Sequence, residues 1–418
     1  MILIENAKVL SDGKLKSANI LIEENKIKAI GDVKDKSDYV INAKELAVIP
    51  GLFNSHTHCA MTLFRGYAED MPLQEWLEKK IWPAEARLNE EIVYWASKLA
   101  CVEMLKSGTT FFFDMYFFPS ATARAVEETG IRACLSSAFF DFFSKDLLEA
   151  NLKRVEKELN ELKNFKVLRA IAPHAVYTVS LEGLKRAMEI AEKEDIFVHF
   201  HLAETEKEVI DFRKKNGNGI VKALDEIGFL NQRLISAHCV WLEKEEIELM
   251  AKRKVSAVHC PTSNMKLSVG KALNYPEMKK AGLNVLLGTD GTASNNSLDM
   301  LREMKVSALL QKFYYGADSF KAVDAFKIAT ENASKAFGIK AGKVEVGWLA
   351  DLVLIDLSKI PMNPCHDLIA NLVYSSASEC IDTVIVDGKI VVENGYFEGE
   401  EKILEKFNKI AEKFFGSA

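Results

Sequence analysis

The sequence lacks the features that mark membrane, secreted and nucleic-acid-binding proteins. No apolar stretch among its 418 residues reaches the roughly 18 residues of a membrane span. Residues 1–32 contain no basic segment followed by an unbroken apolar core, as a secretory signal would. No run of Lys or Arg is long enough to follow a phosphate backbone, and the net charge is −6. We therefore expect a cytoplasmic protein that binds neither nucleic acid nor a membrane.

Cysteine motifs are also missing. The seven cysteines are scattered, with no Cys-X-X-Cys, so the sequence offers neither a zinc-finger spacing nor a disulfide framework. The H-x-E and P-C-x-x-C motifs of one class of zinc deaminases are absent as well. What is present is an ordinary composition for a soluble protein with a large core, 48% hydrophobic and 27% charged.

The middle of the chain alternates between strand-like and helix-like segments. Residues 93–108 and 180–194 are typical of these helices, the first followed by Gly108 as a C′ residue and the second capped by Ser180. Eight apolar segments have the length and texture of strands: residues 46–56, 109–116, 132–140, 166–174, 196–204, 234–239, 255–260 and 283–290. Eight strand-then-helix units predict an α/β protein with a (β/α)₈ barrel.

Both ends of the chain are rich in short strands instead. Residues 1–50 read as a small sheet, and residues 345–400 return to strand texture, with Asp387-Gly388 as a hairpin turn. We expect these two parts to form one domain and residues 51–344 to form the barrel. Residues 401–418 are a charged amphipathic helix, expected at the surface or at a subunit contact.

Polar residues with metal-binding and acid–base chemistry recur where the barrel strands end. His56 and His58 are separated by one residue, so in a strand they would face the same side and could bind one metal ion. A single histidine at such a place is more often structural. Several such polar residues are harder to explain as structural, because the carboxyl ends of all barrel strands meet at one mouth and would bring them together. The further residues are His174, His201, Glu204, His238 and Asp290.

These residues lie in motifs that resemble a known family. PGLFNSHTH, HFHLAET, ISAHC and LGTDGTASNN resemble the signature of the amidohydrolase superfamily. MTLFRGYAEDMPLQEWL, WPAEARL and APHAVYTVS resemble the 5′-methylthioadenosine/S-adenosylhomocysteine deaminases and the similar 5′-deoxyadenosine deaminases. The resemblance implies a TIM-like metal-dependent hydrolase barrel with a composite β-sandwich from both chain ends. It also implies a homo-oligomer, with a tetramer as one arrangement.

The resemblance further implies one divalent metal ion, Zn²⁺, held by His56, His58, His201 and Asp290, with a water completing its shell. Nitrogen ligands suit zinc, although ligand identity alone leaves Fe²⁺, Mn²⁺ and Ni²⁺ open. Binuclear members of the superfamily bridge their metals with a lysine on the fourth strand. Residues 166–174 have no lysine near their end, which favours one metal.

Roles in catalysis follow from the same resemblance. Glu204 would carry a proton to the purine ring nitrogen, Asp290 would take the proton of the metal-bound water, and His238 would orient the hydroxide. Glu85 would receive the ribose hydroxyls, and His174 would lie near the sugar and the purine. The implied reaction is hydrolytic deamination of a small nucleoside, a 5′-modified adenosine, to its inosine analogue plus ammonia.

The 5′ substituent depends on residues 131–148. Members that take S-adenosylhomocysteine generally have arginines there, which can clamp a carboxylate. This chain has Ser136 and Ser137 where one arginine is expected, with Lys145 near the second position. The phenylalanines that make the segment apolar favour a short apolar 5′ group, as in 5′-deoxyadenosine or 5′-methylthioadenosine. Lys145 could still serve a carboxylate, so S-adenosylhomocysteine and adenosine stay open as substrates. The phenylalanines are Phe139, Phe140, Phe142 and Phe143.

Neighbouring residues receive structural expectations. Ser294 and Asn295 are expected to cap the following helix. His199 is expected to fill the barrel or support a ligand, and Cys59 to face away from His58 and be inert.

Two alternative functions stay open at this point. The first is another amidohydrolase that acts on a free base or a triazine-like ring, such as a guanine or cytosine deaminase or a chlorohydrolase. The second is a non-catalytic assembly protein on the same barrel, which predicts missing metal ligands. This chain keeps all four.

Overall fold

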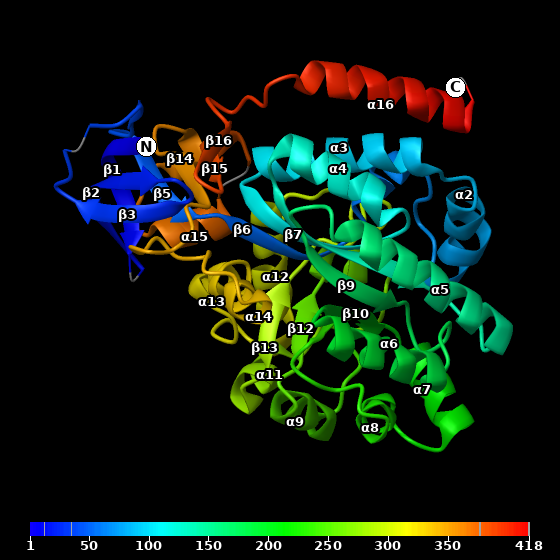
Figure 1. Cartoon of the computed structure of the whole chain (residues 1–418). Helices are drawn as coiled ribbons and strands as arrows, with labels where there is room; N and C mark the ends of the chain where they lie inside the picture. Colours follow the sequence, from blue (N-terminus) through cyan, green and yellow to red (C-terminus); the bar gives the residue numbers. More distant parts are fainter. Residues whose placement is uncertain (12, 35, 376–377, 417–418) are drawn as a thin grey trace.

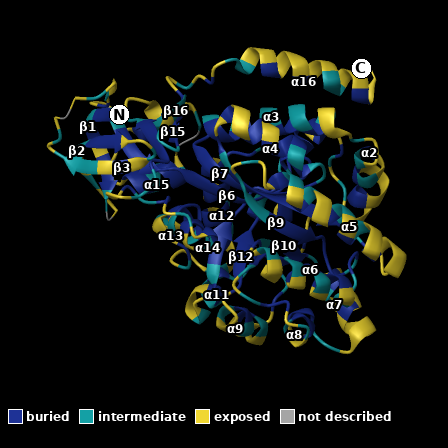
Figure 2. Ribbon diagram, in the orientation of Figure 1, coloured by how far each residue is buried: buried dark blue, intermediate teal, exposed yellow. Residues whose placement is uncertain are grey.

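Two sheets organise the chain in the computed structural model, which describes residues 1–11, 13–34, 36–375 and 378–416. One is an eight-stranded parallel sheet in the middle of the chain, and the other is an eight-stranded sheet built from both chain ends (Figure 1). The barrel strands are buried, whereas the helices around them are exposed on their outer faces (Figure 2).

The parallel sheet is the predicted (β/α)₈ barrel. Its strands lie in chain order, and the last returns to the first, where Asp290 N donates to His56 O at 3.0 Å. All eight predicted segments contain a barrel strand. The strands are β6 (Leu52–Thr57), β7 (Thr109–Tyr116), β8 (Arg132–Phe139), β9 (Leu168–Pro173), β10 (Phe197–Leu202), β11 (Leu234–His238), β12 (Ser256–His259) and β13 (Asn284–Leu287).

The first predicted strand, residues 46–56, is wrong as a single element. β5 (Leu46–Pro50) belongs to the terminal sheet, and only β6 belongs to the barrel. Gly51 lies at the break, where a Cβ atom would come within 2.1 Å of Thr110 Oγ1. The chain passes from one sheet to the other where Gly51 packs against Thr110. The apolar run of residues 46–56 does not show this break.

Helices surround the barrel. The predicted helix ends are confirmed: Ser180 Oγ accepts from Gly183 N at 3.0 Å, and Gly108 follows its helix with φ +80°. The helices are α3 (Glu90–Lys106), α4 (Pro119–Thr129), α5 (Lys145–Leu162), α6 (Leu181–Glu194), α7 (Glu206–Asn216), α8 (Ile220–Glu226), α9 (Lys244–Lys252), α10 (Pro261–Lys266), α11 (Tyr275–Ala281), α12 (Met300–Tyr315), α13 (Ala322–Ile328) and α14 (Glu331–Phe337).

The terminal sheet joins strands that are far apart in sequence, in the order β16-β15-β14-β5-β1-β2-β3, with β4 beside β1. The predicted hairpin turn is confirmed, with φ of 52° at Asp387 and 73° at Gly388. A Cβ atom at Gly388 would lie 1.9 Å from Glu24 O, so this turn packs directly on the β2–β3 turn. The strands are β1 (Ile2–Ser11), β2 (Lys14–Glu23), β3 (Lys26–Gly31), β4 (Tyr39–Asn42), β14 (Leu352–Asp356), β15 (Ile381–Val386) and β16 (Lys389–Val392).

Two further segments shape the barrel mouth. Between β6 and α3 the chain forms short helical turns, among them α1 (Leu73–Trp76) and α2 (Trp82–Glu85). The predicted C-terminal helix is α16 (Glu400–Phe415), which lies along α3 (Figure 1); residues 417 and 418 are outside the described residues. No helix in the described part of the chain is long and apolar enough to span a membrane.

Candidate active site

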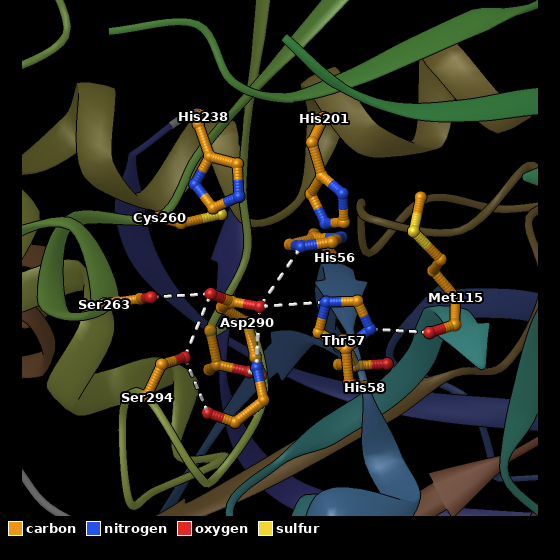
Figure 3. Close-up of polar contacts among 12 residues, drawn as sticks. His56, Thr57, His58, Met115, His201, His238, Cys260, Ser263, Asp290 and Ser294 are labelled. Carbon is orange, nitrogen blue, oxygen red and sulfur yellow. Dashed lines mark hydrogen bonds and ion pairs between the residues drawn. The ribbon is translucent and has the colours of Figure 1, made fainter. Parts of the chain in front are cut away.

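Four histidines and one aspartate meet at the carboxyl ends of the barrel strands (Figure 3). His56 and His58 come from the end of β6, His201 from β10, His238 from β11 and Asp290 from the residues after β13. Nε2 of His56 and Nε2 of His58 each lie 3.2 Å from Asp290 Oδ1. The centre of the His56 ring is 5.1 Å from that of His201 and 5.5 Å from that of His238. The sequence-predicted metal ligands are thus brought together.

Hydrogen bonds to the outer ring nitrogen orient these imidazoles. Nδ1 of His58 lies 2.5 Å from Met115 O, and Nδ1 of His201 lies 3.1 Å from His174 O. A carbonyl can only accept, so each Nδ1 carries a hydrogen and Nε2 is the nitrogen that faces the cluster. Metal-ligating histidines in proteins are oriented in this way.

His199 orients His56 through a short relay. Its Nδ1 lies 2.9 Å from Ile235 O, so Nδ1 donates and Nε2 accepts from His56 Nδ1 at 2.7 Å. The ring also stacks on Phe113 at 4.0 Å, so His199 both fills the barrel and supports a candidate ligand. His56 Nε2 is left buried with no hydrogen-bond partner in the described part of the chain, as expected of an atom that binds a metal ion.

Two groups of donor atoms fit a metal ion. His56, His58 and Asp290 form one group and His56, His201 and His238 the other, with the ligand atoms of each group within 4.8 Å of one another. Imidazole nitrogens with one carboxylate are a donor set that zinc favours. His238 is therefore a near neighbour of the predicted set of four.

The Asp290 carboxylate is held ionised. Burial acts to raise its pKa, but contacts with His56 and His58 outweigh burial and hold the pKa well below its usual range. Ser263 Oγ donates to Asp290 Oδ2 at 2.5 Å and Ser294 Oγ at 3.0 Å. Asp290 also has a left-handed backbone, with φ +64°. Such strain is typical of functional sites.

The expected helix cap at Ser294 and Asn295 is wrong. The following helix, α12, begins at Met300, and Asp299 caps it by accepting from Leu301 N at 2.9 Å. Ser294 turns back to Asp290 because the residues between β13 and α12 form an extra turn before the helix begins.

Glu204 lies beside the cluster as a buried carboxyl group. Burial raises its pKa to about 8, with a further contribution from Asp290. Its Oε2 lies 3.7 Å from His238 Nε2. Glu208, on α7, fixes the backbone by accepting from Glu204 N at 2.8 Å. Glu204 is therefore positioned to hold a proton at neutral pH.

His238 is oriented by a residue that sequence reasoning missed. Its Nδ1 lies 2.9 Å from Asn264 Oδ1, and burial lowers its pKa. Asn264 and Ser263 both come from α10, which starts at Pro261 directly after β12. The available signal in the sequence was Pro261, since a proline directly after a barrel strand indicates a helix that begins at the barrel mouth.

One cavity is lined by His58, His201, Glu204, His238 and Asp290, and its empty space, counted out to open solvent, is about 620 Å³. Glu85, on α2, and His174, after β9, also line it, as the sequence predicted. Burial raises the pKa of Glu85 to about 7. Trp82 and Tyr177 complete the wall and were not predicted.

Residues 131–148 contribute unevenly to this cavity. Phe140 lines it, but Phe139 is buried in the core. Ser136 donates to Asp114 O at 2.6 Å and Ser137 contacts Glu158; neither lines the cavity. The serines thus stand away from any substrate bound there.

Cys59 agrees with its structural expectation. Its buried thiol lies 3.4 Å from Ser97 Oγ, and burial raises the pKa of that thiol well above its usual range. The thiol is therefore protonated and a poor nucleophile.

Comparison with known proteins identifies this barrel and site. The chain belongs to the Amidohydrolase family, which it matches over residues 47–391. It is 62% identical, over the full length of both chains, to 5-methylthioadenosine/S-adenosylhomocysteine deaminase 1 of Archaeoglobus fulgidus. It is 45% identical to 5′-deoxyadenosine deaminase of Methanocaldococcus jannaschii, covering 99% of each chain.

A solved structure shares both the barrel and the terminal sheet. The crystal structure of an adenosine deaminase from Xanthomonas campestris with bound zinc superimposes with a TM-score of 0.94 at 32% identity, over 99% of this chain and 98% of the other.

Proposed function

We propose that this protein is a zinc-dependent aminohydrolase that converts 5′-modified adenosines to the inosine analogues plus ammonia. The observation that carries the proposal is the meeting of Glu204, His238 and Asp290 with three further histidines at the carboxyl ends of the barrel strands, beside one cavity. The names of these two relatives support the nucleoside class of substrate. They do not favour the alternative of a free base or a triazine-like ring.

His56, His58, His201 and Asp290 would hold a single zinc ion. Bound there, the ion would lower the pKa of a coordinated water towards 7 and so supply a nucleophile at neutral pH. The orphan Nε2 of His56 and the fixed Nδ1 atoms of His58 and His201 support this assignment.

The acid–base roles belong to three side chains. Glu204, protonated at neutral pH, delivers its proton to the ring nitrogen beside the amino-bearing carbon, which makes that carbon electrophilic. Asp290, kept ionised, accepts one proton of the attacking water and passes it to the amine, which leaves as ammonia when its C–N bond breaks. The proton of the new C–O–H group returns to Glu204 as the carbonyl of the product forms. His238, whose Nε2 lies 3.7 Å from Glu204 Oε2, orients the attacking water.

Substrate is held at two further points. Glu85 accepts hydrogen bonds from the two ribose hydroxyls, since a carboxylate has one oxygen for each hydroxyl of a diol. His174 lies beside the sugar and the purine. The apolar wall formed by Trp82 and Phe140 favours a short apolar 5′ group. A homo-oligomeric assembly and a cytoplasmic location stay predictions.

The test is ammonia release by zinc-loaded protein from 5′-deoxyadenosine, 5′-methylthioadenosine, S-adenosylhomocysteine, adenosine and free adenine. We expect turnover of the 5′-modified nucleosides and none of adenine. Turnover of adenine alone, or of no compound, would refute the proposal.

A further inference from the structure

A second hollow adjoins the candidate active site, and we call it the outer pocket. Three of its lining residues, Leu73, Trp82 and Tyr177, also line the inner cavity, so the two spaces share a wall. The outer pocket is therefore the space next to the inner cavity on the side of these three side chains. The lining residues that matter here are Leu73, Trp82, Phe142, Phe143, Tyr177 and Lys215.

A row of aromatic rings runs from the inner cavity to the outer pocket. The ring of Phe140 lies 4.7 Å from that of His174 and 5.7 Å from that of Phe142, to which it is almost parallel at 10°. Trp82 meets Phe142 edge-on at 6.5 Å. Aromatic rings pack well against apolar carbons and against polarizable sulfur. The row thus suits an aliphatic thioether chain that extends outward from the sugar.

The rings at the outer end are exposed and conformationally strained. The exposed fractions are 54% for Phe142 and 50% for Phe143, and φ is +44° and +62°. Large side chains rarely adopt this backbone conformation. The buried Asp141 carboxylate holds it by accepting from Phe143 N at 2.8 Å and from Ser180 Oγ at 2.6 Å. Two apolar rings kept in this way at the mouth of a site indicate a ligand-facing surface.

A cation stands beside these rings. Lys215, on α7, places its Nζ 3.5 Å from the centre of the Phe143 ring. The other lysine of the outer pocket, Lys207, is paired with Asp211. Two more carboxylates line the pocket: Glu208 accepts from backbone N–H groups and Glu78 accepts from Gln74. Lys215 forms no ion pair with the described residues, so its ammonium group is the one left to meet a ligand anion. Lys145, an earlier candidate for this role, is exposed at the start of α5 and lines neither space.

We propose that the outer pocket is the subsite for an extended 5′ tail, a thioether chain ending in a carboxylate, and that Lys215 pairs with that carboxylate. Short 5′ groups end in the inner cavity and do not reach Lys215. The assignment rests on the proposed deaminase function, and it predicts that tail selection can be changed without loss of the chemistry.

The test compares kcat/KM for 5′-methylthioadenosine and S-adenosylhomocysteine, which share the thioether and differ in the amino-acid tail. Lys215→Met should lower kcat/KM for S-adenosylhomocysteine about threefold to fivefold, mainly through KM, because the ion pair is solvent-exposed. Lys215→Glu should lower it about tenfold or more, since it adds repulsion. Both variants should leave 5′-methylthioadenosine within about twofold. Lys214→Met is the matched control, because Lys214 is exposed on the same helix and does not line the pocket.

The outcomes separate this inference from the function beneath it. If the wild type deaminates neither nucleoside, the proposed function fails. If it deaminates 5′-methylthioadenosine but not S-adenosylhomocysteine, or if Lys215→Glu lowers both rates alike or neither, the function stands and the subsite is wrong. A change confined to the carboxylate-bearing substrate supports the subsite.

Discussion

Replacing Glu204 with glutamine tests the acid–base assignment most directly. The two side chains have the same shape, so the fold and the donor atoms of the histidine cluster stay in place. Burial raises the pKa of Glu204 to about 8, so burial favours the protonated carboxyl group at neutral pH. Glutamine can donate a hydrogen bond but cannot transfer a proton. We expect kcat to fall by about 10² to 10⁴, the range of general acid–base catalysis, with little change in KM.

The pH profile gives this prediction a second readout. The protonated form of Glu204 is the competent one, so activity should fall as pH rises through the pKa of Glu204. A divalent ion nearby favours the carboxylate and lowers that pKa, which puts this alkaline limb at or below about pH 8. The residual activity of Glu204→Gln should lack the limb.

The assay is ammonia release with metal content measured on the same samples. Glu206→Gln is the control, because Glu206 is exposed in the first turn of α7. Loss of metal from Glu204→Gln would make Glu204 a ligand, and an unchanged kcat or a retained alkaline limb would show that it is not the proton donor.

Three further predictions concern the metal and the fold. Removal of metal by a chelator should abolish ammonia release and lower the thermal unfolding midpoint, with zinc restoring both; activity in metal-free protein would contradict the site. His199→Phe should weaken zinc affinity about 10- to 100-fold in a chelator competition, because His56 Nδ1 loses its acceptor, and unchanged affinity would count against the relay. Gly388→Ala should lower the free energy of unfolding by more than about 2 kcal/mol, since its Cβ meets Glu24 O. Gly228→Ala, with similar φ but no neighbour within 4 Å, should cost only about 1 kcal/mol; equal losses in a denaturant titration would contradict the close-contact argument.

Local pattern predicts the barrel well. Each strand is a short apolar run bounded by a helix signal, and caps such as Ser180 and Gly108 depend on neighbouring residues alone. The expected domain division fell between residues 50 and 51, but the strand break at that point was missed, because β5 and β6 read as one apolar run and separate only where two sheets diverge. The cap at Ser294 was wrong for a similar reason: its partner, Asp290, lies in the site and not in the next helix.

The sequence alone predicts the residue types of the site and their positions at strand ends. Barrel topology brings every strand end to one mouth, so the sequence predicts that the polar residues at those ends lie together. The choice of His56, His58, His201 and Asp290 among them as metal ligands rests on the family resemblance. Packing alone sets the rest. The raised pKa of Glu204 is caused by burial, which cannot be predicted from the spacing of residues in the sequence. Lys215 and Phe143 are far apart in sequence and come together only because the folded barrel sets the paths of the loops that carry them.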